Sequence, residues 1–255
     1  MILALDVGNT NVVAGCIEDG KILNVFRFQT ETDRTDIEYA VKIRQMLEIY
    51  GIEGKSFQGA IISSVVPPVT GALCSAVKIL TGCDCLVVGP GLKTGMNVRI
   101  DDPGTLAGDL LVGSVAAMEC YGAPVLVLDM GTATTLVAVD KNRSFIGGAI
   151  MPGVRLSMQA LSKGTSLLPD ISISDPKKCI GTNTVDCMRS GLVYGTAAMV
   201  DGMIERMKEE LGYDCPVVAT GGLAPMVTGH CKNSVICDDE LLLKGLWIIW
   251  NKNKK

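Results

Sequence analysis

Short apolar runs alternate with polar breaks along the whole chain, and this alternation predicts its secondary structure. Met1 to Leu5 and Pro124 to Leu128 are apolar runs of the length of buried strands. Each is followed by a polar turn and then by a second apolar or β-branched run, Val12 to Ile17 or Thr135 to Val139. The first 30 residues are therefore predicted to form three strands joined by turns.

Other segments have the spacing of helices or of single strands. Helical periodicity predicts helices over 35–50, 69–80, 105–121, 185–211 and 241–250. Short apolar runs predict further strands over 58–66, 85–88 and 217–219. The prolines at 67 and 68 are expected to stop a strand, and 147–153 is expected to be a Gly/Pro loop that leads into a helix ending near Leu161. Helices and strands intermixed in this way indicate an α/β protein.

Two similar turns carry the candidate chemistry. Asp6-Val7-Gly8-Asn9-Thr10 follows the first apolar run, and Asp129-Met130-Gly131-Thr132-Ala133-Thr134 follows the run about half a chain later. Glycine lets a backbone approach a phosphate closely, main-chain N–H groups and Thr or Asn side chains donate to its oxygens, and Asp can hold a compensating cation. One such turn is also a common structural turn. Two at the ends of buried strands predict duplicated α/β lobes, 1–117 and 118–255, with a nucleotide cleft between them.

Composition excludes several functional classes. The chain has 255 residues, of which 48% are hydrophobic and 20% charged, and its net charge is −4, so we expect neither nucleic acid nor an anionic membrane as a partner. No apolar run approaches the ~20 residues of a membrane-spanning helix, and Asp6 interrupts the apolar N-terminus too early for a signal peptide. A soluble, cytoplasmic protein is expected.

The cysteines and the histidine do not predict a metal site. Ten cysteines are spread from Cys16 to Cys237 without Cys-x-x-Cys spacing, and we expect them to be reduced core residues. The single histidine, His230, excludes a multi-histidine metal site and leaves little scope for a serine–histidine triad.

Asp109 is the candidate catalytic residue away from the turns. It lies in an apolar helical segment, Ala107-Gly108-Asp109-Leu110-Leu111, with no Lys or Arg nearby in sequence. Apolar surroundings raise the pKa of a carboxyl group, which suits a general base for an alcohol substrate. The alternative is a solvent-facing residue on an amphipathic helix. Gly221-Gly222, after the strand over 217–219, is a candidate platform for the nucleotide's base or ribose.

Together these motifs resemble the actin-like ATPase and sugar-kinase superfamily and, within it, the type III pantothenate kinase family. The similarity covers nearly the whole chain. It rests on Asp6-Val7-Gly8-Asn9-Thr10-Asn11, Ile62-Ser63-Ser64-Val65-Val66-Pro67-Pro68, Val88-Gly89-Pro90-Gly91, Lys93-Thr94-Gly95, Asp129-x-Gly131-Thr132-Ala133-Thr134, Gly147-Gly148-Ala149-Ile150-x-Pro152-Gly153, Gly181-x-Asn183-Thr184, Ser190-Gly191 and Thr220-Gly221-Gly222-Leu223-Ala224.

The resemblance implies two actin-like (ribonuclease H-like) lobes and ATP-dependent phosphorylation of the 4′-hydroxyl of pantothenate, the first step towards coenzyme A. It implies a homodimer that needs Mg²⁺ or another divalent ion and K⁺ or NH₄⁺. The glycines at 191, 195 and 202 also suit a helix that packs closely on a neighbour.

The resemblance also assigns roles to individual residues. Asp109 would be the proton acceptor, Asp129 would bind the monovalent cation, and Asp6 would bind the divalent ion. Pantothenate would contact Ile100, Ala107, Gly108, Asp109, Leu110 and Thr184. The ATP and phosphate site would comprise Asp6, Val7, Gly8, Asn9, Thr10, Asn11, Val12, Val13, Thr132, Gly221 and Gly222.

Two positions depart from the family's pattern on the acceptor side. Ile100-Asp101-Asp102-Pro103 stands where the family has Tyr-Asp-Asn-Pro, and Ala107-Gly108-Asp109-Leu110 where it has Gly-Ala-Asp-Arg. Leucine cannot replace the fixed fork of donors of a guanidinium. Arg99, which precedes Ile100, could supply positive charge only if its side chain points into the site. The alternatives are therefore a related small-molecule kinase with an altered acceptor pocket, a non-catalytic nucleotide-binding regulatory protein on the same fold, and a phosphohydrolase.

Overall fold

The computed structural model describes residues 1–52 and 57–254. These residues form two compact units. Unit 1 comprises Met1–Gly95, Asp102–Ala116 and Glu240–Lys255, and unit 2 comprises Met96–Asp101 and Ala117–Asp239. The helix at 241–250 was expected in the second lobe. It packs instead with unit 1, so this unit is built from separate stretches of the chain.

Unit 1 contains a mixed sheet in the order β3-β2-β1-β4-β5. β1 is antiparallel to β2 and parallel to β4, and the parallel pairing continues to β5. The strands are β1 (Ile2–Val7), β2 (Asn11–Glu18), β3 (Lys21–Gln29), β4 (Ala60–Ser64) and β5 (Cys85–Val87), and the helices are α1 (Asp36–Ile49), α2 (Pro67–Thr81), the first part of α3 (Gly108–Tyr121) and α7 (Leu241–Asn253).

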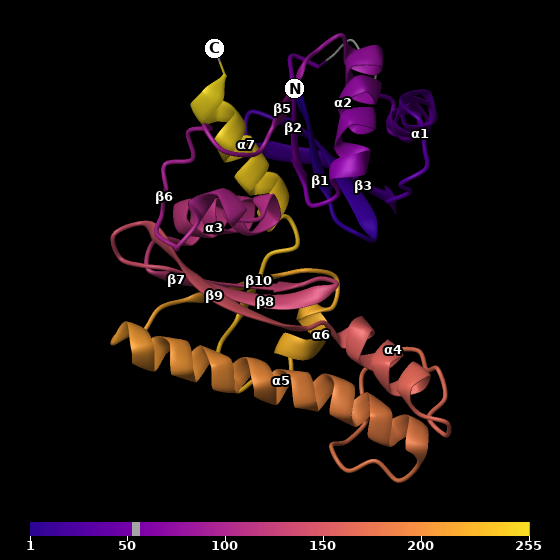
Figure 1. The fold of residues 1–255 in the computed structure, drawn as a ribbon, viewed down its shortest axis with the longest axis vertical. Coiled ribbons are helices and arrows are strands. Elements are labelled where there is room, and N and C mark those ends of the chain that lie inside the picture. Colours follow the sequence, from indigo (N-terminus) through magenta and orange to yellow (C-terminus); the bar gives the residue numbers. More distant parts are fainter. Residues whose placement is uncertain (53–56, 255) are drawn as a thin grey trace. The chain divides into compact units, whose positions relative to one another are not determined.

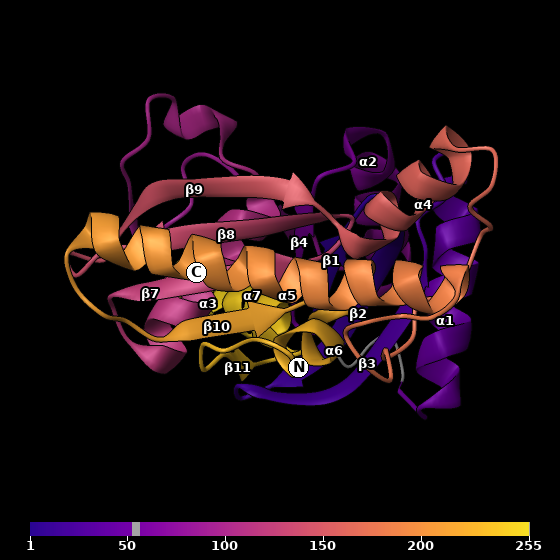
Figure 2. The same ribbon diagram turned by 90° about the horizontal axis from the view of Figure 1, so that it is seen from below.

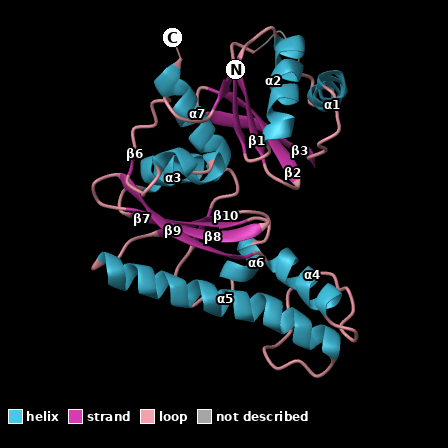
Figure 3. Cartoon of the chain, viewed as in Figure 1, coloured by secondary structure: helices cyan, strands magenta, loops and turns pink. Residues whose placement is uncertain are grey.

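The two faces of this sheet are covered by different helices (Figures 1 and 3). Leu3, Leu5 and Val7 of β1 belong to a core cluster that includes buried residues of α1 and α2. Because side chains alternate along a strand, Asp6 points to the opposite face. α7 covers that face: the Cβ of any residue replacing Gly15 would lie 2.8 Å from Leu243 Cδ1.

Unit 2 repeats this arrangement. Its sheet has the order β11-β10-β7-β8-β9-β6, and α5 runs along one side of it (Figure 2). Its strands are β6 (Asn97–Val98), β7 (Val125–Met130), β8 (Ala133–Val139), β9 (Ser144–Pro152), β10 (Val217–Thr220) and β11 (Ile236–Cys237), and its helices are α4 (Val154–Gly164), α5 (Thr184–Leu211) and α6 (Ala224–Thr228). A 3₁₀ turn, Pro103–Thr105, precedes α3.

The strand order confirms the predicted duplication. β9-β8-β7-β10-β11 in unit 2 has the order of β3-β2-β1-β4-β5 in unit 1, with antiparallel pairing before the central strand and parallel pairing after it. The two Asp-x-Gly turns therefore occupy the same place in the two sheets, after the central strand. The α/β class is confirmed as well.

One local prediction was wrong. The expected loop over 147–153 is mostly the strand β9, and its glycines allow close packing: a Cβ at Gly148 would lie 2.3 Å from the backbone oxygen of Leu136. The strand expected before Pro67 and Pro68 does end there, at Ser64. The two prolines also begin α2, two residues earlier than expected, because the first turn of a helix does not need their missing N–H groups.

Gly245 of α7 has a steric role that mutation can test. A Cβ at this position would lie 2.2 Å from the backbone oxygen of Val112 in α3. We therefore expect Gly245→Ala to lower the free energy of unfolding by about 1–3 kcal/mol through overpacking. The matched control is Gly71→Ala on α2, where nothing lies within 4 Å of the added methyl group. The control should raise stability by up to about 1 kcal/mol through helix propensity. Equal effects of the two changes in urea titrations would contradict the packing described here.

Candidate functional site

The β1–β2 turn is held by its own hydrogen bonds and by Thr30. The Gly8 N–H donates to the Asn11 carbonyl at 3.0 Å, and Thr30 Oγ1 donates to the Gly8 carbonyl at 2.7 Å. Asn9 and Thr10 are exposed at its tip. The turn over residues 8–11 is thus closed by a backbone hydrogen bond and tied to the end of β3 by Thr30.

The valines beside this turn have a different position from its tip. Val7 and Val12 are buried in the unit 1 core, so they can offer a ligand only main-chain groups. Asp6 and Val13 are register partners on the opposite sheet face. Within residues 6–13, the structure therefore distinguishes exposed residues at the tip, buried valines in the core and the acidic side chain of Asp6 on the other face.

Asp109 lies in the first turn of α3, within unit 1. The Leu110 N–H donates to Asp109 Oδ1 at 2.7 Å. Burial is the main influence on this carboxyl group and raises its pKa, while the N–H groups of Leu110 and Asp109 oppose the rise. Asp109 is thus a half-buried acid with an elevated pKa, as the sequence predicts for a base.

The start of α3 packs near the strand of Asp6. Ser63 of β4 is the register partner of Asp6, and its Oγ would lie 3.1 Å from a Cβ at Gly108. Unit 1 therefore places Asp6 and the α3 turn that carries Asp109 on one face of its sheet.

The β7–β8 turn in unit 2 is the counterpart of the first turn. Asp129 of β7 pairs with Thr135 of β8 and Thr220 of β10. Thr132 is exposed at the turn, and a Cβ at Gly153 would come within 2.1 Å of its carbonyl oxygen. The start of α4 is thereby packed closely against the turn.

Gly221 is also required by backbone packing. Its φ of +100° is unfavourable for other residues, and a Cβ there would lie 2.6 Å from the Met130 oxygen. The Gly221-Gly222 turn therefore lies directly against the end of β7. Its proposed contact with a nucleotide remains a prediction.

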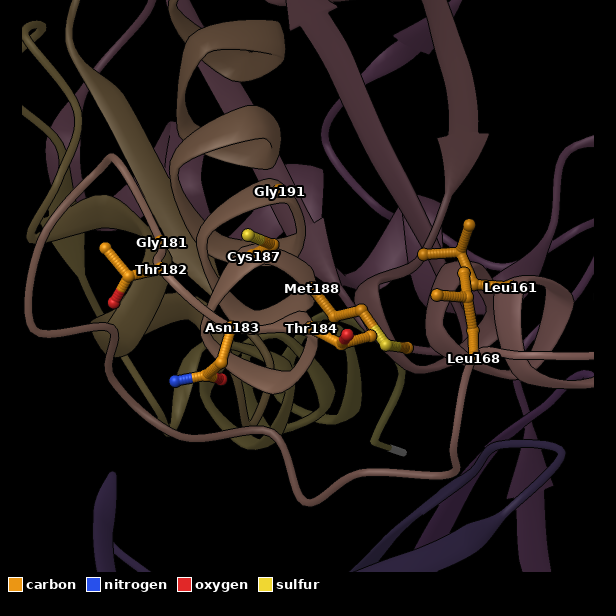
Figure 4. A pocket seen from close by; sticks show the side chains of 9 residues that line it. All are labelled: Leu161, Leu168, Gly181, Thr182, Asn183, Thr184, Cys187, Met188 and Gly191. Carbon is orange, nitrogen blue, oxygen red and sulfur yellow. The ribbon is translucent and has the colours of Figure 1, made fainter.

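Thr184 is the first residue of α5 and lines an open pocket of about 650 Å³ in unit 2 (Figure 4). Apolar side chains of Leu161, Leu168 and Met188 line it beside the polar Thr182 and Asn183. Asn183 caps α5 by accepting the Asp186 N–H at 2.9 Å. This pocket suits a ligand with both apolar and hydrogen-bonding groups.

The other residues predicted to contact pantothenate are divided between the two units. Ala107, Gly108 and Leu110 lie at the start of α3 in unit 1 and are partly buried. Ile100 belongs to unit 2, where its Cγ2 would be 4.0 Å from a Cβ at Gly147.

The acidic side chains near the two turns suit a cation that keeps water and phosphate ligands, rather than one bound by protein side chains alone. Within residues 1–52 and 57–254, no group of three or more His, Cys, Asp or Glu side chains is placed to hold a metal ion. Mg²⁺ is commonly bound by one or two carboxylates together with waters and substrate phosphates. A single carboxylate such as Asp6 beside a phosphate turn fits this mode. The buried, unpaired hydroxyl of Thr135, the register partner of Asp129, adds an unused oxygen in unit 2.

Sequence reasoning missed several supporting residues. Thr30 reaches the first turn from β3, and Leu161, Leu168 and Met188 form the apolar side of the Thr184 pocket. No local pattern marks these residues. Ser63 lies within β4, and the sequence around it does not show that it is close to the start of α3.

Separately, no helix in the described part of the chain is long and apolar enough to cross a membrane.

Comparisons with a family model and with curated relatives give the same family. Residues 2–206 match the model of the family described as type III pantothenate kinase. The chain is 40% identical over 253 residues to a type III pantothenate kinase of Halalkalibacterium halodurans, covering 99% of this chain and 100% of the relative. It is also 40% identical to that of Bacillus cytotoxicus, covering 99% and 97% of the two chains.

Solved structures with low sequence identity share the fold. A candidate 2-dehydro-3-deoxygalactonokinase of Sinorhizobium meliloti matches with a TM-score of 0.62 at 14% identity, covering 98% of both chains. Component A of (R)-2-hydroxyglutaryl-CoA dehydratase from Acidaminococcus fermentans matches with a TM-score of 0.59 at 14% identity, covering 97% of this chain and 95% of the other. At such identities the likeness concerns the fold alone.

The elevated pKa of Asp109 predicts a pH-dependent effect of its substitution on stability. Burial raises the pKa in the folded protein above the ordinary value of 3.8. As pH rises between the unfolded and folded pKa values, the folded protein holds a proton that the unfolded chain has released, so the free energy of unfolding falls. Asp109→Asn should remove this fall. Its stability relative to the unchanged protein should therefore increase from about pH 4 upwards and then level off.

Urea unfolding at a series of pH values measures this difference. The matched control is Asp33→Asn, which changes an exposed carboxylate in the same unit. A stability difference for Asp109→Asn that is flat across the range would show that Asp109 is not buried as described.

Proposed function

The chain belongs to the type III pantothenate kinase family, and we propose that it transfers the γ-phosphoryl group of ATP to the 4′-hydroxyl of pantothenate. It is accordingly an ATP-dependent kinase of coenzyme A biosynthesis that uses a divalent metal ion. The observation that carries the assignment to individual residues is the position of Asp109. Its carboxyl group has an elevated pKa and lies in the first turn of α3. That turn is on the same sheet face as Asp6, the first residue of the predicted phosphate turn.

Asp109 would act as the proton acceptor. In phosphoryl transfer, most of the catalysis comes from alignment of the reactants and from neutralisation of charge. A base positioned within hydrogen-bond reach takes the proton of the acceptor hydroxyl, and a raised pKa makes it a stronger base. The half-buried setting of Asp109 supports this role.

The turns would bind the nucleotide and its cations. Residues 6–13 would cradle phosphate through main-chain N–H groups and the exposed side chains of Asn9 and Thr10, with Thr132 and Gly221-Gly222 as further nucleotide contacts. Asp6 would hold the divalent ion, which supplies neutralisation of phosphate charge. Asp129 would bind K⁺ or NH₄⁺. The rigid hydrogen bonding of the first turn supports a phosphate site, since a fixed backbone needs little reorganisation on binding.

Pantothenate would contact Thr184 at the open pocket of unit 2, and residues 107–110 at the start of α3. Its two methyl groups and its amide match a pocket with both apolar and polar walls. We further propose that the protein acts as a cytoplasmic homodimer, by analogy with the family.

A second candidate function is phosphorylation of a related small molecule in place of pantothenate. Leu110 and Ile100 favour it, because they stand where the family has Arg and Tyr. The loss of a hydrogen bond to a charged group weakens binding by about 1.5–3 kcal/mol, roughly tenfold or more.

The direct test of the proposal measures phosphopantothenate by mass after incubation with ATP, Mg²⁺ and pantothenate, with and without K⁺. We expect product that depends on Mg²⁺ and increases with K⁺. Asp109→Asn should lower kcat by about 10²–10⁴-fold, the usual contribution of a general base, while ATP binding persists. ATP binding without product from the unchanged protein would favour the second candidate or a regulatory role. Absence of nucleotide binding would exclude a kinase.

Restoring the arginine that the family has at position 110 tests whether pantothenate is the phosphoryl acceptor. We expect Leu110→Arg to lower the KM for pantothenate about tenfold, since a guanidinium can bind its carboxylate through two donors. The KM for ATP should not change. Leu110→Met is the uncharged control. An unchanged pantothenate KM in both variants would mean that another residue already binds the carboxylate, or that pantothenate is not the acceptor.

A further inference from the structure

Two cysteines of unit 1 contact each other, although the proposed function gives neither a role. Cys74 lies on α2, and Cys85 is the first residue of β5. Ala60, the register partner of Cys85 on β4, belongs to the core cluster that includes buried residues of α2, so Cys85 points to the sheet face that α2 covers. There the thiol groups of Cys74 and Cys85 share a hydrogen bond. Both cysteines are free and partly exposed.

An ion pair holds the same two segments together. One turn after Cys74, Lys78 Nζ lies 2.8 Å from Oδ1 of Asp84, the residue that precedes Cys85. The pair is exposed and adds little to stability, but it joins α2 to the start of β5 close to the two thiols. Both cysteines also pack against the core of unit 1. The two thiols are therefore already side by side in the folded protein, which a disulfide requires.

The two thiols differ in acidity. Donation by the Cys85 thiol stabilises a thiolate at Cys74, so the hydrogen bond lowers the pKa of Cys74 and raises the pKa of Cys85, and burial adds to the second effect. By contrast, burial raises the pKa of Cys16, Cys215 and Cys231. The thiolate is the form of cysteine that reacts with oxidants. Cys74 is thus suited to react first, with Cys85 beside it as a second thiol.

We propose that Cys74 and Cys85 form a peroxide-sensitive dithiol, in which Cys74 reacts with hydrogen peroxide and Cys85 then closes a disulfide. The Cys74 thiolate attacks one peroxide oxygen, the O–O bond breaks, and the other oxygen leaves as hydroxide and is protonated to water. Cys74 is then a sulfenic acid. The Cys85 sulfur attacks the Cys74 sulfur, the S–O bond breaks, and the released hydroxide takes the Cys85 proton. Two thiols lose two electrons in total, and one peroxide is reduced to two waters.

The disulfide joins the edge strand of the unit 1 sheet to a helix that covers the sheet. β5 is the last strand in the order β3-β2-β1-β4-β5. A covalent link from β5 to α2 closes a short loop and restricts the unfolded chain, so the oxidised protein should melt at a higher temperature than the reduced protein. This inference is independent of the proposed function, because it uses neither the nucleotide turns nor Asp109.

Substitutions of Cys85 separate its two parts in the reaction. Cys85→Ser keeps a hydroxyl group that can donate to the Cys74 thiolate but cannot form a disulfide. Cys85→Ala removes both the donor and the second sulfur. The matched control is Cys83→Ser, since Cys83 lies two residues away and its Sγ donates instead to the Phe57 carbonyl at 3.4 Å.

The test treats the folded, reduced protein with a small excess of hydrogen peroxide and maps its peptides without reduction by mass spectrometry. The unchanged protein and Cys83→Ser should give a linked peptide pair, Cys74 to Cys85, that dithiothreitol separates. With dimedone present, Cys85→Ser should accumulate the sulfenic acid adduct at Cys74. Cys85→Ala should form this adduct several-fold more slowly, because the thiolate has lost its donor. The rise in melting temperature on oxidation should be absent in Cys74→Ser.

Three results would overturn the proposal. The first is that Cys74 and Cys85 stay reduced while the exposed cysteines, Cys120, Cys179, Cys187 and Cys237, are oxidised. The second is that the linked pair forms only after unfolding in urea. The third is that dimedone labels Cys85 in Cys74→Ser as fast as it labels Cys74 in Cys85→Ser. The mapping of the unchanged protein needs no substitution, so the first two results can be obtained even if a variant does not fold.

Discussion

The parallel pairing of the central strand in each unit determines where the candidate residues lie. β1 pairs with β4 in parallel, and β7 pairs with β10 in the same way. Parallel strands end at the same edge of a sheet, so the residues after them share one place. This brings the turn after β1 to the edge where β4 ends in Ser63 and Ser64, and the turn after β7 to the edge where β10 leads into Gly221. The antiparallel hairpin on the other side closes each turn tightly.

A carboxyl group at such an edge is subject to opposing influences. The N–H groups at the start of α3 favour the charged form of Asp109, while burial disfavours it and is the larger effect. The result is a group that is held in place by the helix and is still basic. A buried aspartate in the middle of a helix would lack free N–H donors, because those N–H groups bond within the helix. An aspartate on the surface would lack the burial that raises the pKa. The first turn of α3 is therefore a suitable place for a base.

The sequence was sufficient to predict the α/β class, the duplication and most strands and helices, because buried strands and amphipathic helices leave periodic patterns. It failed at β9, where Gly147, Gly148 and Pro152 suggest a loop, since packing against the backbone of β8 cannot be seen in local composition. It also failed for α7, whose pattern predicts a helix but not the unit that the helix joins. For the site, the turns and Asp109 stood out by residue type. The positions of Ser63, Thr30 and the apolar wall of the Thr184 pocket depend on tertiary contacts between distant segments and could not be predicted from spacing.

The return of α7 to unit 1 constrains the order in which the protein can fold during synthesis. The ribosome makes the strands of unit 1 first, then all of unit 2, and α7 only afterwards. Until α7 emerges, Gly15 and the rest of that sheet face lack the helix that packs on them. A nascent chain with an uncovered apolar sheet face is prone to aggregate and is a natural client for chaperones. Unit 2 is interrupted only by a short excursion into unit 1 and can acquire its core without that delay, so it is the unit expected to fold first on the translating ribosome.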